Sequence, residues 1–153
     1  MPFVTTRDKV QLNYVDEGQD RPVVLSHGWP LSGESFAQNR AALLEAGFRV
    51  ITYDRRGFGA SDKPEGGYDY DTLAEDLNAL ITHLDLKDVA LLGFSMGGGD
   101  VLRYLRFFGH DRVSHLILSG AVSPALGITD NNPDGAMPVQ AFLDMADQFE
   151  EDP

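Results

Sequence analysis

The chain alternates between short apolar runs and longer stretches in which apolar residues recur at helical spacing. The runs predict strands, and two of them, 23–26 and 89–92, are continuous enough for strands buried on both faces. Alternating apolar and polar residues predict a further, half-buried strand near 10–15. The other predicted strands are 48–53 and 113–118, and the predicted helices are 34–46, 71–84 and 96–108. Because strands that alternate with amphipathic helices form crossover units, we expect an α/β fold with a mainly parallel sheet and flanking helices.

The pattern changes at about residue 124, and we divide the chain there. Residues 1–123 carry the strand and helix pattern, and we interpret them as the N-terminal part of an α/β core. Residues 124–153 begin with a loop rich in proline and glycine and continue with one predicted short helix at 139–149. We interpret this second part as the start of a lid region, acidic and truncated.

Composition and charge narrow the classes of protein that fit. The 153 residues match a single domain, and the absence of cysteine excludes disulfides, thiolate metal sites and a cysteine nucleophile. The formal net charge is −12, so the surface repels phosphate backbones and we expect no nucleic-acid partner. No apolar run approaches the ~18 residues of a membrane span. We therefore expect a cytoplasmic protein with no membrane partner.

One motif points to nucleophilic catalysis. Gly93-Phe94-Ser95-Met96-Gly97 is a G-x-S-x-G sequence that follows the predicted strand at 89–92 and opens a predicted helix. Such a tight strand-to-helix turn projects the serine Oγ from the sheet edge, and Gly93 and Gly97 leave out β-carbons that would clash. The N–H of Met96 is then a candidate donor to an oxyanion. The alternative is a glycine-rich turn in which Ser95 is incidental.

A second motif, His27-Gly28-Trp29-Pro30, follows the predicted strand at 23–26. Gly28 permits a turn, so the N–H of Trp29 is a candidate second donor to the same oxyanion. We interpret His27 as a structural histidine that holds the loop, with a role as base as the alternative. Pro30 lacks an N–H and has a fixed φ, which constrains the direction of the Trp29 carbonyl.

The glycine-containing stretch 54–62 follows the next predicted strand, at the sheet edge where ligand crevices form in parallel sheets. We interpret Asp54 and Arg55 as residues that organise this loop, and catalysis by the Asp54 carboxylate is the alternative. His83, His110 and His115 are isolated in the sequence, and we expect them at the surface or at helix ends.

Cofactor and metal motifs are incomplete. Neither 57–59 nor 97–99 continues as G-x-G-x-x-G, and no Gly-Lys-Ser/Thr occurs, which argues against dinucleotide and P-loop sites. Residues 130–135 copy the first half of an EF-hand loop, but Pro133 interrupts it and Ala141 stands at its twelfth position. We expect no cofactor and no metal.

Together, the strings HGWPLSGESF, YDRRGFGASDKP and GFSMGGGDVLRY resemble the α/β-hydrolase superfamily. Within it they are similar to the bacterial cofactor-free haloperoxidase (perhydrolase) and aryl esterase branch. The resemblance covers about residues 1–128. It implies that Ser95 is the nucleophile and that Trp29 and Met96 are the oxyanion-hole donors. In that branch a proline where Pro30 stands accompanies the formation of peracids, so the implied substrates are a small ester, or a carboxylic acid plus peroxide.

The resemblance also shows what the chain lacks. The family's triad runs serine, acid, histidine, with the last two on later strands, and no histidine here follows His115. Without a base, Ser95 is a weak nucleophile. We therefore expect the 153-residue chain alone to be inactive, and to self-associate or pair with a complementary C-terminal half. Two alternatives stay open: a non-catalytic half-domain that acts by association, and another hydrolase-fold enzyme such as a hydroxynitrile lyase or peptidase.

Overall fold

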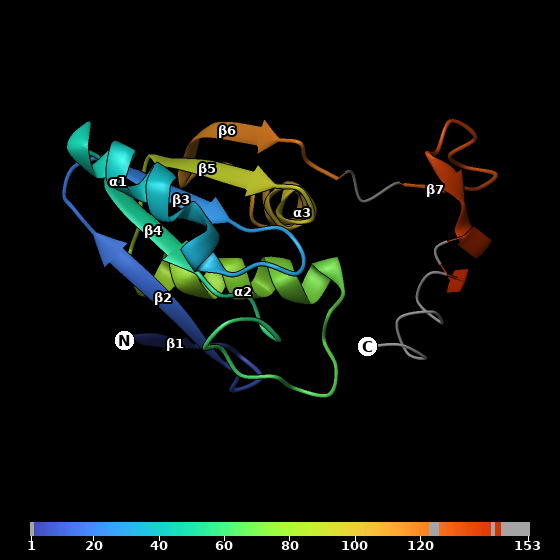
Figure 1. The fold of residues 1–153 in the computed structure, drawn as a ribbon, viewed down its shortest axis with the longest axis horizontal. Coiled ribbons are helices and arrows are strands. Elements are labelled where there is room, and N and C mark those ends of the chain that lie inside the picture. Colours follow the sequence, from blue (N-terminus) through green and yellow to red (C-terminus); the bar gives the residue numbers. More distant parts are fainter. Residues whose placement is uncertain (1, 123–125, 142, 145–153) are drawn as a thin grey trace. The chain divides into compact units, whose positions relative to one another are not determined.

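The computed structural model describes residues 2–122, 126–141, 143 and 144, and it contains a six-stranded sheet in the order β1-β2-β4-β3-β5-β6 (Figure 1). The strands are β1 (Phe3–Thr5), β2 (Gln11–Glu17), β3 (Pro22–Ser26), β4 (Arg49–Tyr53), β5 (Val89–Phe94) and β6 (Val113–Ser119). Strands β4, β3, β5 and β6 are neighbours in that order and pair in parallel. Strand β2 pairs antiparallel with both β1 and β4. The predicted α/β fold with a mainly parallel sheet is confirmed.

Flanking helices connect the parallel strands. They are α1 (Ala37–Glu45), preceded by the 3-10 turn η1 (Gly33–Phe36), α2 (Tyr70–His83) and α3 (Gly97–Phe108). The predicted helix at 34–46 is thus divided into two parts. Helix α2 begins after Asp69, whose carboxylate accepts a 2.9 Å hydrogen bond from the Thr72 N–H, as expected of an N-cap aspartate.

Apolar packing on the two faces of the sheet is unequal. Between the sheet and α2 and α3 lies the larger cluster, which includes Leu77, Leu80, Ile81 and Val101, all with no exposed side-chain surface. The opposite face, under α1, has a smaller cluster made of Val23, Leu25, Phe36, Val50 and Ala90. No residue of α1 itself is fully buried. The face under α1 is therefore only partly covered.

Strand β6 is an edge of the sheet, and most of its length is exposed. Leu116, Ile117 and Leu118 have 38%, 42% and 46% of their surface accessible, although their neighbours on β5 are largely buried. An apolar run of this kind is normally found on a strand with partners on both sides. Strand β6 thus has the sequence of an interior strand in an edge position.

The chain consists of two compact units, Met1–Val122 and Ser123–Pro153. In the second unit, β7 (Gly127–Ile128) and β8 (Met137–Pro138) pair in parallel, inside the stretch predicted to be a loop. Residues 139–141, 143 and 144 are helical, and the rest of the helix predicted at 139–149 lies outside the described residues. The role of this unit as a lid stays a prediction. None of the helices described could cross a membrane, given their length and polarity.

Candidate active site

Ser95 lies in the turn between β5 and α3, and its backbone is held in an unusual conformation. Its φ is +53°, in the left-handed region that residues other than glycine rarely adopt. The Ser95 N–H donates to the Ser119 carbonyl at 3.1 Å, and the Ser95 carbonyl accepts from the N–H groups of Gly98 and Val122. These bonds fix a strained turn at the carboxyl end of β5, which is the geometry of a nucleophile elbow.

Close backbone packing explains the two glycines on either side of the turn. A β-carbon on Gly93 would lie 2.5 Å from the Gly97 carbonyl oxygen, and one on Gly97 would lie 2.4 Å from the Ser26 carbonyl oxygen. Both distances are shorter than any van der Waals contact. Only glycine fits at these two positions while α3 remains this close to β3 and β5.

The loop after β3 lies against the same turn. A β-carbon on Gly28 would be 2.9 Å from Ser95 Cβ and 3.3 Å from Ser95 Oγ. The next residue, Trp29, is half-exposed and joined to Pro30 by a cis peptide bond. Met96 directly follows Ser95 and is the N-cap of α3. The structure therefore brings the Ser95–Met96 turn and the Gly28–Trp29 loop together at the carboxyl ends of neighbouring strands.

His27 is completely buried, and both of its ring nitrogens bond to the main chain. The Arg55 N–H lies 3.1 Å from Nε2 and can only donate, so Nε2 is the acceptor and Nδ1 carries the proton, which it donates to the Gly28 carbonyl at 2.8 Å. Burial lowers the pKa of His27 to about 4, so the ring is neutral near pH 7. This arrangement supports a structural role, because neither nitrogen can take a proton from Ser95.

Asp54 joins two loops through its carboxylate. Its Oδ1 accepts from the Gly33 N–H at 2.8 Å, and its Oδ2 accepts from the Ala60 N–H at 2.9 Å. Both oxygens thus bind main-chain donors, which supports the interpretation that Asp54 organises the loop.

Beneath the site lies a buried polar network that the sequence analysis did not predict. Asp100, in the first turn of α3, is fully buried and accepts from the Arg55 guanidinium at 3.1 Å and from the Ser26 hydroxyl at 2.9 Å. Ser26 also bonds to the Tyr53 hydroxyl at 3.0 Å. Burial raises the pKa of Asp100, and the guanidinium opposes that shift. An acidic residue following three glycines at a helix start is the sequence signal that could have indicated it.

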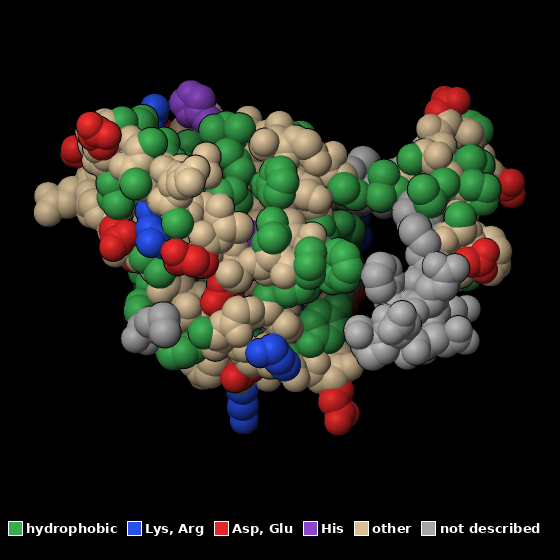
Figure 2. Space-filling view, in the orientation of Figure 1, with side chains coloured by type: hydrophobic (Ala, Val, Ile, Leu, Met, Phe, Trp, Pro, Cys, Tyr) green, Lys and Arg blue, Asp and Glu red, His purple; other side chains and the backbone are tan. Residues whose placement is uncertain are grey.

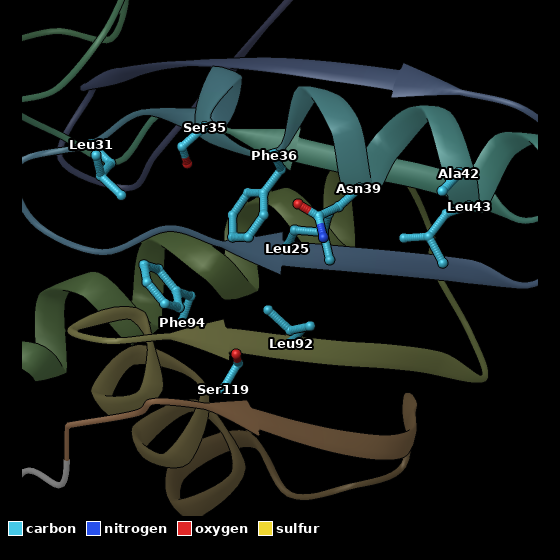
Figure 3. Close-up of a pocket in the computed structure, with 10 residues that line it drawn as sticks. All are labelled: Leu25, Leu31, Ser35, Phe36, Asn39, Ala42, Leu43, Leu92, Phe94 and Ser119. Atoms are coloured by element: carbon cyan, nitrogen blue, oxygen red, sulfur yellow. The ribbon is translucent and has the colours of Figure 1, made fainter.

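A groove of about 510 Å³ lies along the partly covered face of the sheet. Figure 3 shows Leu25 and Leu92 on the strands facing Phe36, Asn39 and Leu43 of η1 and α1. Phe94, which precedes Ser95 in the chain, and Ser119, whose carbonyl accepts from the Ser95 N–H, also line the groove. Its lining is mainly apolar.

The remaining histidines lie elsewhere. Nε2 of His83, at the end of α2, is 3.4 Å from the Tyr14 hydroxyl, and His115 is exposed on β6 with Nδ1 3.1 Å from the Ser114 hydroxyl. Within the described part of the chain, no three histidine, aspartate or glutamate side chains are grouped so that they could hold a metal ion.

Comparison with known proteins agrees with this geometry. The family model described as alpha/beta hydrolase fold matches residues 21–151, which is most of the chain. This chain belongs to the α/β-hydrolase fold family. It resembles that family in sequence over the whole of the elbow, the Gly28 loop and the buried network beneath them.

This α/β-hydrolase chain is similar to named proteins and to solved structures. It is 48% identical to a non-heme chloroperoxidase of Kitasatospora aureofaciens over 93% of its length and 51% of the relative's. Among solved structures, an esterase from Exiguobacterium antarcticum matches with a TM-score of 0.92 and 42% identity, over 98% of this chain and 56% of that one. A bromoperoxidase from Bacillus anthracis matches with a TM-score of 0.85 and 47% identity, over 91% and 51%. The chain spans about half the length of the relatives it matches.

Proposed function

We propose that Ser95 is the nucleophile of a serine hydrolase that cleaves carboxylic esters and also makes peracids. The observation that carries the proposal is the left-handed Ser95 in a hydrogen-bonded turn, with the Gly28 loop packed against it. Relatives named as esterase and as non-heme chloroperoxidase support both activities.

In this proposal, Ser95 Oγ attacks the ester carbonyl carbon while its proton passes to a histidine base. The N–H groups of Trp29 and Met96 donate to the oxyanion of the tetrahedral intermediate. Collapse of the intermediate breaks the bond to the alkoxide, which leaves as the alcohol after protonation, and an acyl group stays on Ser95. Water then attacks the acyl-enzyme to give the acid, or hydrogen peroxide attacks it to give the peracid. With a carboxylic acid as acyl donor, water leaves in place of the alcohol.

Peracid formation accounts for halide oxidation without a redox cofactor. The peracid transfers its terminal oxygen, together with the proton on it, to bromide or chloride in free solution, giving hypohalous acid and the carboxylate anion. Pro30 fixes its own φ and restricts Trp29, so we propose that it sets the Trp29 carbonyl where it favours peroxide over water.

We further propose that the catalytic acid and histidine come from a complementary C-terminal half, which docks on the exposed part of the sheet. Two features support this. Edge strand β6 has an apolar sequence and, among the described strands, pairs with β5 alone, and the groove beside α1 is apolar and open. Apolar side chains reach the surface in the region of α1, β5 and β6 (Figure 2). The relatives, about twice as long, have room for such a half.

One alternative keeps specific support: a non-catalytic half-domain that acts only by association. His27 has both ring nitrogens bonded to the main chain, so it cannot serve Ser95 as a base. Under this alternative Ser95 never forms an acyl-enzyme, whatever polypeptide is added. A hydroxynitrile lyase or a peptidase on the same fold would differ in residues of the lid and of later strands.

The experiment that tests the proposal traps the acyl-enzyme. The complete enzyme, with whichever polypeptide supplies the acid and histidine, is mixed with p-nitrophenyl acetate and quenched in acid. Peptide mass spectrometry should then find one acetyl group on Ser95 in the wild type and none in Ser95→Ala. Acetyl groups on other side chains only, or turnover with Ser95 unmodified, would contradict the proposal.

A further inference from the structure

The Arg55 side chain and the Arg55 backbone reach two different parts of the candidate site. Nη1 of its guanidinium lies 3.1 and 3.3 Å from the two carboxylate oxygens of Asp100, in the first turn of the helix that begins after Ser95. Its main-chain N–H donates to Nε2 of His27. His27 in turn holds the Gly28 carbonyl through Nδ1. Arg55 thus links the elbow to the loop that carries Trp29.

These links form a closed series of contacts that begins and ends at Ser95. From Ser95 the helix leads to Asp100, the ion pair leads to Arg55, the N–H bond leads to His27, and the loop returns at Gly28 to Ser95. Phe58 adds a second connection, because the Arg55 guanidinium lies 5.6 Å from its ring centroid and the His27 ring meets it edge-on at 5.5 Å. Each residue in this closed series of contacts is therefore held in place by the others.

Burial makes this closed series of contacts rigid. The side chains of Arg55 and Asp100 are 1% and 0% exposed, so water cannot replace either partner. Removing one charge would leave the other buried and unpaired, which is strongly destabilising. His27 is also fully buried, and its neutral form is the one that can accept from Arg55.

We propose that Arg55 is the positioning residue of the oxyanion site, holding the Ser95–Met96 turn and the Gly28–Trp29 loop at a fixed separation through Asp100 and His27. The inference rests on the proposed function, because it assumes that these two segments supply the two oxyanion donors. An error of about 1 Å in such a site can cost 100-fold in rate. Arg55 itself touches no reacting atom.

Arg56 provides a matched control next to Arg55. It is equally buried, and its guanidinium bonds to Asp76 on α2 at 2.6 and 2.7 Å. A second carboxylate, that of Asp8, accepts from it at 2.9 Å. These partners connect α2 and the β1–β2 connection to the sheet. They form no hydrogen bond with Asp100 or His27 in the described part of the chain. Both arginines therefore stabilise the fold, whereas of the two only Arg55 forms hydrogen bonds to Asp100 and His27.

The experiment compares two double variants of the complete enzyme, Arg55→Met/Asp100→Asn and Arg56→Met/Asp76→Asn. Each removes both charges of a buried pair, so neither leaves a buried ion unpaired. Asp8, which also loses its Arg56 partner in the second variant, has a side chain that is half-exposed to water. Tm, kcat and KM for p-nitrophenyl acetate are measured, and the His27 Nδ1–H signal is followed by ¹⁵N NMR. Arg55→Lys with Asp100 intact is the conservative rescue. Only one guanidinium nitrogen, Nη1, bonds to Asp100, and a lysine ammonium can take its place.

We expect the Arg55 double variant to lose at least about tenfold in kcat with KM nearly unchanged, since the lost positioning acts in the transition state. Its His27 Nδ1–H should exchange faster with water, and Arg55→Lys should recover part of both. The Arg56 double variant should lower Tm and leave kcat and the His27 signal as in the wild type. Equal kcat losses in the two variants, or no change in the Arg55 variant, would overturn the inference. The His27 signal reports on the Asp100–Arg55–His27 contacts even if Ser95 proves not to be a nucleophile.

Discussion

Gly28 lies directly against Ser95, closer than any residue with a side chain could. A β-carbon built on Gly28 would be 2.9 Å from Ser95 Cβ, so one of the two segments would have to move. The absence of a side chain at position 28 is therefore part of the geometry of the elbow. It brings the loop after β3 to the point where our proposal places the second oxyanion donor.

The first prediction follows from this contact. We expect Gly28→Ala to lower kcat for ester hydrolysis by at least about tenfold, because the loop and Ser95 are pushed apart by some tenths of an ångström. The matched control is Gly66→Ala, since a β-carbon there meets nothing within 4 Å and the residue has no positive φ. Steady-state kinetics of both variants in the complete enzyme provide the test. Equal activities of the two variants would show that the contact has no catalytic importance.

The second prediction concerns Pro30 and the balance of two activities. Pro30→Leu should lower the rate of peracetic acid formation from acetate and peroxide relative to the rate of ester hydrolysis, because leucine frees the φ of position 30 and relaxes the Trp29 carbonyl. Bromination of monochlorodimedone, measured with and without a chelator, reports the peracid. A ratio that stays at the wild-type value, or bromination that the chelator abolishes, is incompatible with the proposed role.

The third prediction concerns the exposed edge of the sheet. The 153-residue chain on its own should self-associate through β6 and show no Ser95 labelling by a fluorophosphonate, since none of its histidines is placed to serve as the base. Ile117→Lys should reduce the mass seen by light scattering, because a lysine on an edge strand opposes strand pairing. Phe3→Lys is the control on the opposite edge strand, with 44% exposure against 42% for Ile117. A monodisperse wild-type monomer would contradict the prediction, as would rapid stoichiometric labelling.

The fourth prediction is a loss of stability in mild acid. The pKa of His27 falls from 6.5 to about 4 on folding, so between these pH values the unfolded chain binds more protons than the folded one. The free energy of unfolding should therefore decrease as the pH is lowered from 6.5 toward 4, with about 3 kcal/mol from this residue at most. Urea unfolding at several pH values measures this. His27→Asn should show a smaller slope over the same window, and an unchanged slope would exclude His27 as the cause.

Much of the fold could be predicted because its signals are local. The run at 23–26 is continuous and apolar, and β3 is buried along its whole length. The short strand β1 gave no signal, because three residues make no pattern and its position depends on pairing with β2. The same holds for the β7–β8 pair inside a predicted loop. The split between η1 and α1 also escaped prediction, because both parts share one apolar pattern.

The candidate site divides in a similar way. Ser95 and Gly28 could be found from short motifs, because each motif requires a local turn. The Arg55–Asp100 pair could not, since its members are 45 positions apart and meet only when β4 and α3 have packed. The roles of Ser95, Trp29, Met96 and Pro30 stay predictions, because they depend on a bound substrate.

The most direct test of the account is the effect of Ser95→Ala on ester hydrolysis by the complete enzyme. Initial rates with p-nitrophenyl acetate should fall by a factor on the order of 10⁶ if a triad acts as a unit, with Tm close to the wild-type value. Ser114→Ala, at the opposite end of β6 from the elbow, should keep the wild-type rate. If Ser95→Ala instead turns over the ester at the wild-type rate, Ser95 is not the nucleophile and the account is wrong.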